Sequence, residues 1–407
     1  MMQPPQPRSR TIHLVAAEES GDALGAALAR ALIETEGSAV RLGGVGGRGM
    51  AAAGIASPFP IDDLSIIGAT AIPRRLPVIL RRIRQTADAV IAARPDALVI
   101  IDSPDFTHRV ARRVRRHAPS IPIIDYVSPT VWAWRPWRAR AMRRYVDGVL
   151  AILPFEPAVH ERLGGPPCVY VGHPLIERVA ELRPNADETQ RRQSDPPLIL
   201  VLPGSRSSEI RRLLAIFGAA IGQVAARVGA IDLVLPTTPH LLQRVREGVA
   251  GWAVQPRLVV EPAEKWAQFR KARAALAASG TVTLELALAG IPTIAAYRIP
   301  AIEHIVAQAA RLPELFSIIL ANLVIGEKIV PEFLQRDCTP DKLADALLSL
   351  LADTPARRRQ IEAFGRLDST MGVGTAAPSS KAAAIVLDLA RRGRSAMTDI
   401  RGNAPSW

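Results

Sequence analysis

Short apolar runs rich in β-branched residues recur along the chain and alternate with longer stretches of helical periodicity. Runs that are apolar at every position are typical of strands buried on both faces, and their alternation with helices indicates parallel sheets of βαβ units. The runs lie at 12–17, 97–102, 121–127, 149–153, 198–202, 232–236 and 292–297. The sequence therefore predicts an α/β fold.

The length of the chain, 407 residues, exceeds the roughly 100–200 residues of an average domain. The segment 183–197 is polar, contains three prolines and has no periodicity, so we interpret it as a linker. A buried strand, a polar turn and a helix open the chain on each side of it. We expect two doubly wound, Rossmann-like domains facing a cleft, at 1–185 and 198–385, and a tail at 386–407 that packs back or is disordered.

Cysteine and charge content narrow the class of protein. The two cysteines, Cys168 and Cys338, lie far apart without metal-ligand spacing, so we expect reduced thiols and a cytoplasmic protein. The start lacks a signal-like apolar segment, and no apolar run is long enough to span a bilayer. The net charge of +13 suits nucleic acid or anionic lipid. Because no nucleic-acid motif occurs, we expect no nucleic-acid partner.

A turn of small polar residues follows the predicted strand at 198–202. Gly204, Ser205 and Arg206 precede a helix with Glu209 in its first turn. Free backbone N–H groups and the helix dipole at such a start favour a phosphate, and Arg206 would add a cation with bidentate geometry. An ordinary turn with a serine cap is the alternative interpretation.

A second helix start of this kind follows the predicted strand ARAALAA. Ser279, Gly280 and Thr281 would present N–H and hydroxyl donors to a diphosphate, and Glu285 would accept hydrogen bonds from ribose hydroxyls. Glu285 is alternatively half of a capping box. Two such turns in one half of the chain favour a nucleotide-diphosphate site over two unrelated caps.

Two carboxylates, Asp102 and Asp105, follow the predicted strand ALVII. Open α/β sheets bind ligands at the carboxyl ends of their strands, so one of the two is a candidate general base. Either is alternatively the N-cap of the next helix. No Asp-x-Asp pair of the metal-holding kind occurs, so we expect no metal or other cofactor, and helix N-termini and arginine would neutralise a leaving diphosphate.

Two segments combine apolar residues with arginine. Residues 126–144 hold Trp132, Trp134 and Trp137 among arginines, a combination that suits a bilayer interface, a sugar site or a core. Residues 72–84, IPRRLPVILRRIR, form either an interfacial helix that binds anionic lipid or a solvated basic face.

Together and in order, these motifs resemble the bacterial lipid A disaccharide synthase family over about residues 12–350. YVSPxVWAWR and LPGSRxxE are specific in combination. The motifs are VAxExSGD at 15–22, GVGG at 44–47, DxPDF at 102–106, YVSPxVWAWR at 126–135, LPFE at 153–156, GHP at 172–174, LPGSRxxE at 202–209, ASGTxxLE at 278–285, ANL at 321–323 and PEFLQ at 331–335.

The resemblance implies a GT-B fold and inverting transfer of 2,3-diacylglucosamine from UDP to the 6-hydroxyl of 2,3-diacylglucosamine 1-phosphate, giving a β-1,6 linkage. It implies that Asp102 is the general base. It also implies a cytoplasmic enzyme held peripherally at the anionic inner face of the bacterial inner membrane. The acceptor-side residues that it implies are Glu19, Ser20, Gly21, Asp22, Ser128, Trp132 and Trp134. The UDP-binding residues are Gly204, Ser205, Arg206, Glu209, Ser279, Gly280, Thr281, Glu285, Asn322 and Gln335.

Two other functions share part of this pattern. A UDP-N-acetylglucosamine 2-epimerase would share the fold and the nucleotide site, but it needs no lipid-facing surface. A non-enzymatic binder of lipid or nucleic acid would use the positive charge without a catalytic carboxylate, and its binding would depend strongly on salt.

Overall fold

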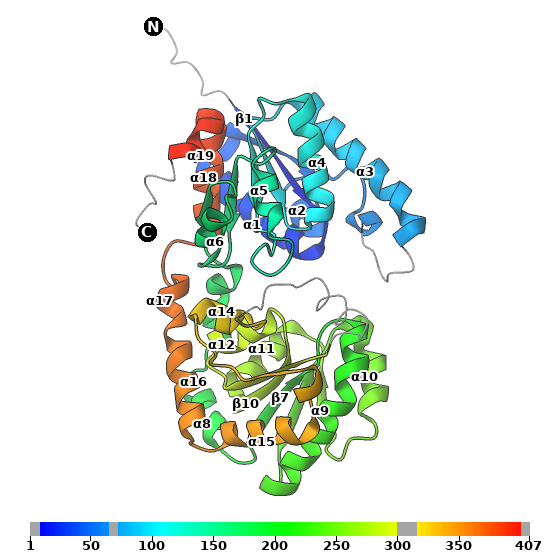
Figure 1. Ribbon diagram of the computed structural model, residues 1–407, viewed down its shortest axis with the longest axis vertical. Helices are drawn as coiled ribbons and strands as arrows, with labels where there is room; N and C mark the ends of the chain where they lie inside the picture. The colour runs from blue at the N-terminus through cyan, green and yellow to red at the C-terminus, as the bar shows by residue number, and fades with distance from the viewer. Residues whose placement is uncertain (1–8, 65–71, 299–315, 400–407) are drawn as a thin grey trace. The chain divides into compact units, whose positions relative to one another are not determined.

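The computed structural model describes residues 9–64, 72–298 and 316–399 (Figure 1). The chain divides into two compact units, one made of Met1–Pro174 with Thr375–Trp407 and the other of Leu175–Gly374. Each unit is built around a six-stranded sheet with helices packed on it. Every strand pair in both sheets is parallel, so the predicted α/β fold class is confirmed.

The sheet of the first unit has the strand order β2-β1-β3-β4-β5-β6. The order reverses between β1 and β3, which pair directly. Its strands are β1 (Arg10–Ala16), β2 (Val40–Val45), β3 (Ala97–Ile101), β4 (Ile123–Tyr126), β5 (Gly148–Ala151) and β6 (Cys168–Tyr170).

Helices cover both faces of this sheet, which explains why the strands are apolar at every position. In β3, Val99 and Ile101 belong to the core beneath α1 and α18, whereas Leu98 and Ile100 belong to the core beneath α3 and α4. Successive side chains of a strand point to opposite faces, so both sets are buried. The helices are α1 (Glu19–Glu36), α2 (Arg48–Ala52), α3 (Ile72–Ala93), α4 (Pro104–His117), α5 (Trp137–Met142), α6 (Glu156–Arg162), α18 (Pro378–Arg392) and α19 (Ala396–Asp399).

Helix α18, near the C-terminus, packs with the first unit, although the predicted second domain extends to residue 385. It lies against α1 (Figure 1). Ala382, Ile385, Val386 and Leu389 of α18 are buried in the same core as β1 and β3. The amphipathic pattern of α18 predicts a buried face, but it does not say which sheet the face covers. Of the expected tail, residues 400–407 lie outside the described residues.

The sheet of the second unit has the order β12-β11-β10-β7-β8-β9 and reverses between β7 and β10. Its strands are β7 (Leu198–Leu202), β8 (Asp232–Pro236), β9 (Arg257–Val259), β10 (Ala274–Ala278), β11 (Thr293–Tyr297) and β12 (Glu332–Leu334). Its helices are α7 (Val179–Leu182), α8 (Ala186–Gln193), α9 (Ser207–Val228), α10 (Leu242–Val249), α11 (Pro262–Lys271), α12 (Val282–Leu288), α14 (Leu320–Ile325), α15 (Pro340–Leu351), α16 (Pro355–Gly365) and α17 (Leu367–Met371). Among the described helices of both units, none has the length and apolarity needed to cross a bilayer.

The segment interpreted as a linker contains a helix, α8. Asn185 caps it: its side chain accepts the N–H of Glu188 at 2.9 Å, and the Glu188 carboxylate accepts the N–H of Asn185 at 3.1 Å. Arg270 on α11 holds the same carboxylate at 2.9 Å. The helix was missed because its residues are polar and it packs through ion pairs rather than an apolar stripe.

Arg192 of α8 joins the ends of two other helices. Its guanidinium donates hydrogen bonds to four backbone carbonyls at the C-terminal ends of α11 and α12, at 2.8–3.3 Å; the acceptors are Phe269, Arg270, Ala289 and Gly290. The last carbonyls of a helix lack intrahelical partners and carry the negative end of the dipole, so a cation there satisfies both requirements. Burial lowers the pKa of Arg192 to about 10, which leaves it charged at neutral pH.

Replacing Arg192 by methionine should destabilise the second unit by about 2–3 kcal/mol, because it leaves partly buried carbonyls without donors. Amide hydrogen exchange in β10 and β11 measures the effect. Arg246→Met, at an exposed position of α10, is the control and should change stability by less than about 0.5 kcal/mol. Equal exchange protection in the two variants would show that Arg192 does not stabilise this unit.

Candidate functional site

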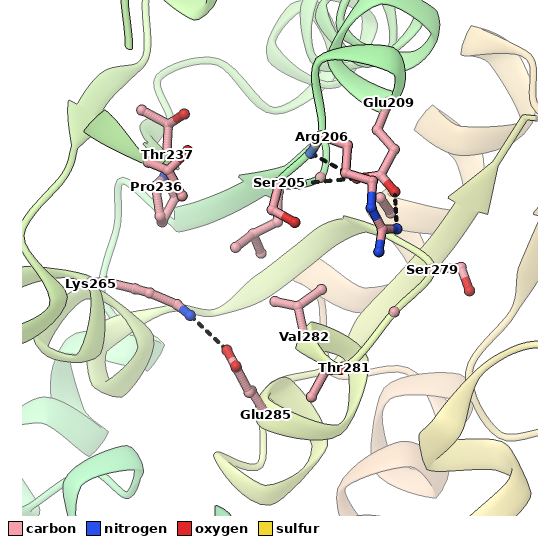
Figure 2. Close-up of a pocket in the computed structure, with 15 residues that line it drawn as sticks. Ser205, Arg206, Glu209, Pro236, Thr237, Lys265, Ser279, Thr281, Val282 and Glu285 are labelled. Carbon is pink, nitrogen blue, oxygen red and sulfur yellow. Dashed lines mark hydrogen bonds and ion pairs between the residues drawn. The ribbon is translucent and has the colours of Figure 1, made fainter. Parts of the chain in front are cut away.

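A pocket of about 370 Å³ opens in the second unit at the carboxyl ends of β7, β8 and β10 (Figure 2). This is the point where the strand order reverses, the usual ligand position in doubly wound sheets. Eight of the residues that line it were predicted from the sequence, namely Gly204, Ser205, Arg206, Glu209, Ser279, Gly280, Thr281 and Glu285. The structure therefore brings both predicted phosphate turns and the predicted ribose carboxylate to one pocket.

The turn after β7 is capped by its own glutamate. The Glu209 carboxylate accepts the backbone N–H groups of Ser205 at 3.0 Å and Arg206 at 3.2 Å, and it contacts the Arg206 guanidinium at 3.2 Å. Gly204 permits this approach: its φ is 111°, and a Cβ there would lie 2.2 Å from the Glu209 carboxylate. The expectation that these N–H groups are free is therefore wrong. The Arg206 side chain remains 77% exposed and available to an anion.

The turn after β10 presents different groups. Gly280 has a φ of 151°, a conformation that L side chains rarely adopt, and it connects β10 to the start of α12. The hydroxyl of Ser279 donates to the carbonyl of Ile318 at 3.0 Å. The N–H groups of Thr283 and Leu284 donate to the carbonyls of Gly280 and Thr281 at 3.1 and 3.0 Å, whereas those of Gly280, Thr281 and Val282 have no acceptor among the described residues and are the donors that this turn offers an anion. Glu285, one turn into α12, forms an ion pair of 2.7 Å with Lys265.

Sequence reasoning missed Lys265 and the Pro236–Thr238 segment, which also line the pocket. Two signals were available. Pro236 ends a predicted strand at the same edge of the sheet as the GSR turn. Lys265 places a cation in the first turn of α11, where the helix dipole disfavours it.

Asn322 and Gln335 are not among the residues that line the pocket. Asn322 is fully buried, and its amide makes four hydrogen bonds within the unit: it donates to Val330 and Glu332 and accepts from Ile329 and Val330, at 2.8–3.0 Å. An amide has no further capacity once both oxygen lone pairs and both N–H groups are used. Asn322 therefore positions the segment that leads into β12.

Asp102 and Ser103 form a strained turn after β3. Both have left-handed backbones, with φ values of 53° and 44°, at a cost of about 1–3 kcal/mol each for residues that are not glycine. The Asp102 carboxylate accepts the Ser103 N–H at 2.7 Å and the hydroxyl of Ser20 at 3.0 Å. Ser103 is the N-cap residue of α4, without a side-chain cap bond, so neither Asp102 nor Asp105 serves as its cap.

The residues of the turn after β1 differ in how deeply they are buried. Asp22 is buried, and its carboxylate accepts the N–H groups of Gly47, Gly49 and Met50 at 2.7–3.0 Å, so it fixes the glycine loop after β2. A Cβ on Gly21 would lie 3.2 Å from the Ile101 carbonyl, so glycine allows α1 to approach β3 closely. Glu19, like Ser20, is exposed.

The loop from Val127 to Arg135 is largely buried or half-buried. Ser128 is buried, 2.8 Å from Nε2 of His160. Trp132 packs edge-on against Phe155, with ring centroids 5.5 Å apart. The Ser128 hydroxyl is therefore engaged within the unit, and its acceptor-side role stays a prediction. Trp134 is 43% exposed.

Glu156, at the start of α6, is a buried acid beside this loop. Burial raises its pKa to about 8, although the N–H of Leu153, which the carboxylate accepts at 3.0 Å, acts in the opposite direction. The folded protein therefore holds this proton at neutral pH, whereas the unfolded chain releases it near pH 4.5.

The stabilisation from protonated Glu156 should be complete below pH 4.5 and should be lost as pH rises through about 8. Glu156→Gln keeps a neutral side chain at every pH. The free energy of unfolding of wild type minus that of the variant should therefore fall by about 2–4 kcal/mol between pH 5 and pH 8. Urea unfolding followed by tryptophan fluorescence measures it, with Glu161→Gln, exposed on the same helix, as the control. An identical pH dependence in wild type and E156Q would show that Glu156 is ionised in the folded protein.

The parts of the chain described by the structure contain no group of three or more His, Cys, Asp or Glu side chains arranged to hold a metal ion.

Comparison with known proteins identifies the family. A family model described as lipid-A-disaccharide synthetase matches residues 12–384. The lipid-A-disaccharide synthase of Bradyrhizobium diazoefficiens is 60% identical over 394 residues, covering 97% of this chain and 100% of that protein. Among solved structures, the S. aureus MnaA–UDP co-structure has a TM-score of 0.61 at 13% identity and covers 98% of both chains. Acinetobacter baumannii MurG has a TM-score of 0.54 at 15% identity and covers 93% of this chain and 99% of that one.

The two solved structures share the fold at identities too low to carry function, and they confirm the GT-B architecture. The family match is a match in sequence. It spans both units and includes the turns after β1, β3, β7 and β10. The chain therefore belongs to the lipid-A-disaccharide synthetase family and is a glycosyltransferase of lipid A biosynthesis.

Proposed function

We propose that the chain transfers 2,3-diacylglucosamine from UDP to the 6-hydroxyl of 2,3-diacylglucosamine 1-phosphate. Inversion at the anomeric carbon gives a β-1,6-linked disaccharide 1-phosphate and releases UDP. Family membership supports the reaction class. The observation that carries the proposal is the strained Asp102–Ser103 turn at the carboxyl end of β3, because backbone strain of this kind clusters at active sites.

Asp102 is the general base in this proposal. Its carboxylate takes the proton of the acceptor 6-hydroxyl as that oxygen bonds to the anomeric carbon and the bond to UDP breaks. Ser20, 3.0 Å away, orients the carboxylate. Asp105 is less suited, because it pairs with Arg138 at 3.1 Å and its side chain is 83% exposed.

The pocket of the second unit binds UDP in this proposal. Arg206 and the helix start after Gly280 neutralise the diphosphate as it leaves. Glu285 accepts hydrogen bonds from the ribose hydroxyls, for which its carboxylate at the pocket wall is suited. Because Glu209 occupies two N–H groups of the GSR turn, the Arg206 side chain is the main contribution of this turn to anion binding.

Asp102→Asn should lower the rate of disaccharide formation by about 10²–10⁴-fold, because it removes the proton acceptor. The measurement is UDP release and product formation in detergent micelles containing EDTA, and UDP affinity should be unchanged. Asp105→Asn is the matched control and should retain activity within about threefold. A reversal of these effects would assign the base to Asp105. A folded, UDP-binding wild type without product would favour the epimerase alternative.

We also propose that the protein works in the cytoplasm, at the anionic surface of the inner membrane. Helix α3 supports this proposal: Leu76 and Leu80 are 42% and 39% exposed. Arg81 and Arg84 are exposed beside them. Leu76, Leu80 and Arg84 are four residues apart and share one face, as in an interfacial helix. The side chains of Arg74 and Arg75 lie outside the described residues.

Trp134 and Trp137, 43% and 66% exposed, form a second candidate contact.

Arg81→Glu/Arg84→Glu should weaken binding to phosphatidylcholine vesicles containing phosphatidylglycerol by about tenfold or more, because each arginine near an anionic surface contributes about 1 kcal/mol. Co-sedimentation at low and high salt measures it. Arg244→Glu/Arg246→Glu, exposed on α10, is the control with equal charge change. If only Trp134→Ser/Trp137→Ser detaches the protein, the contact lies in that loop and the assignment to α3 is wrong.

A further inference from the structure

Lys265 occupies a position that its own helix disfavours. It lies in the first turn of α11, where the positive end of the helix dipole opposes a cation. Its ammonium group lies 2.7 Å from a Glu285 carboxylate oxygen and 4.1 Å from the centroid of the Trp266 ring. The side chain is 25% exposed. The carboxylate and the ring therefore offset the unfavourable interaction of the ammonium group with the helix dipole. The Lys265–Glu285 ion pair joins α11 to α12 at the wall of the pocket (Figure 2).

The ion pair leaves Glu285 half engaged. Lys265 contacts Oε2, whereas no described residue donates a hydrogen bond to Oε1. A glutamate side chain has three rotatable bonds, and fixing it in one rotamer costs conformational entropy. If the side chain were free before binding, this cost would reduce the free energy of ligand binding. Because Lys265 is itself held against Trp266, the pair fixes the carboxylate before a ligand arrives.

We propose that Lys265 is a positioning residue that fixes Glu285 for recognition of the ribose hydroxyls of the nucleotide. This inference rests on the proposed binding of UDP in this pocket. Lys265 acts through Glu285 here, so its contribution should depend on the ribose hydroxyls. A lysine that contacted the base or the diphosphate directly would contribute equally whether or not those hydroxyls were present.

Calorimetric titration with UDP and with 2′,3′-dideoxy-UDP, which lacks both hydroxyls, separates these roles. Wild type should bind UDP about tenfold more tightly than the dideoxy analogue, the size expected for hydrogen bonds to a carboxylate. Lys265→Met should lose most of that preference while binding the analogue as wild type does. Glu285→Gln should lose it as well, and the double variant should lose no more than either single variant.

Two further variants control for folding and charge. Lys265→Arg keeps a cation within reach of Glu285 and should restore most of the preference for UDP. Lys271→Met removes a cation from the other end of α11 and should leave both affinities unchanged. Thermal unfolding of each variant identifies any loss caused by misfolding rather than by the missing contact.

Equal weakening of both ligands by Lys265→Met in a folded protein, or no weakening of UDP binding, would overturn the positioning role and leave the nucleotide site intact. Equal affinity of wild type for the two ligands would overturn the role of Glu285 as well. Failure of wild type to bind UDP would contradict the pocket assignment itself, and with it the proposed function.

Discussion

The direct pairing of β1 with β3, and of β7 with β10, determines where each unit can bind a ligand. At these pairs the strand order reverses, so the connections leaving the two strands turn to opposite faces and leave the strand ends uncovered. In the first unit this brings Ser20 within 3.0 Å of Asp102, although 82 residues separate them. In the second unit it brings the turns after β7 and β10 to one pocket.

The turns at the ends of β3 and β7 combine close contacts to the backbone with left-handed backbone conformations. The left-handed residues Asp102 and Ser103 persist because strand β3 precedes them, helix α4 follows them, and α1 packs near them through Gly21. Gly204 serves the same end in the second unit by admitting the Glu209 carboxylate to the turn. Gly204 is required by its positive φ and by the 2.2 Å that would separate a Cβ from the Glu209 carboxylate, whereas a Cβ on Gly21 would need the Ile101 carbonyl to shift by a few tenths of an ångström.

Much of the site was predictable because its residues follow strands. A strand that is apolar at every position, followed by a short polar turn, predicts the carboxyl edge of a parallel sheet, and Asp102, Arg206 and Gly280 were found in this way. The roles of Glu209 and Asn322 were not predictable, because a side chain that binds backbone groups of its own unit has the same residue type as one that binds a ligand. Lys265 carries a local signal, a cation at a helix start, but its contact with Glu285 on another helix is not specified by local sequence.

Patterning along the chain determined the α/β class, the buried strands and the turns at their ends, because alternation of apolar runs with helical periods is a local property of sequence. Only the tertiary structure decided that α18 returns to the first unit, that α8 is a helix, and that Arg192 joins the ends of α11 and α12. These features depend on contacts between residues far apart in the chain. An amphipathic helix face needs an apolar surface and a buried arginine needs acceptors, but the local sequence does not specify which distant residues supply them.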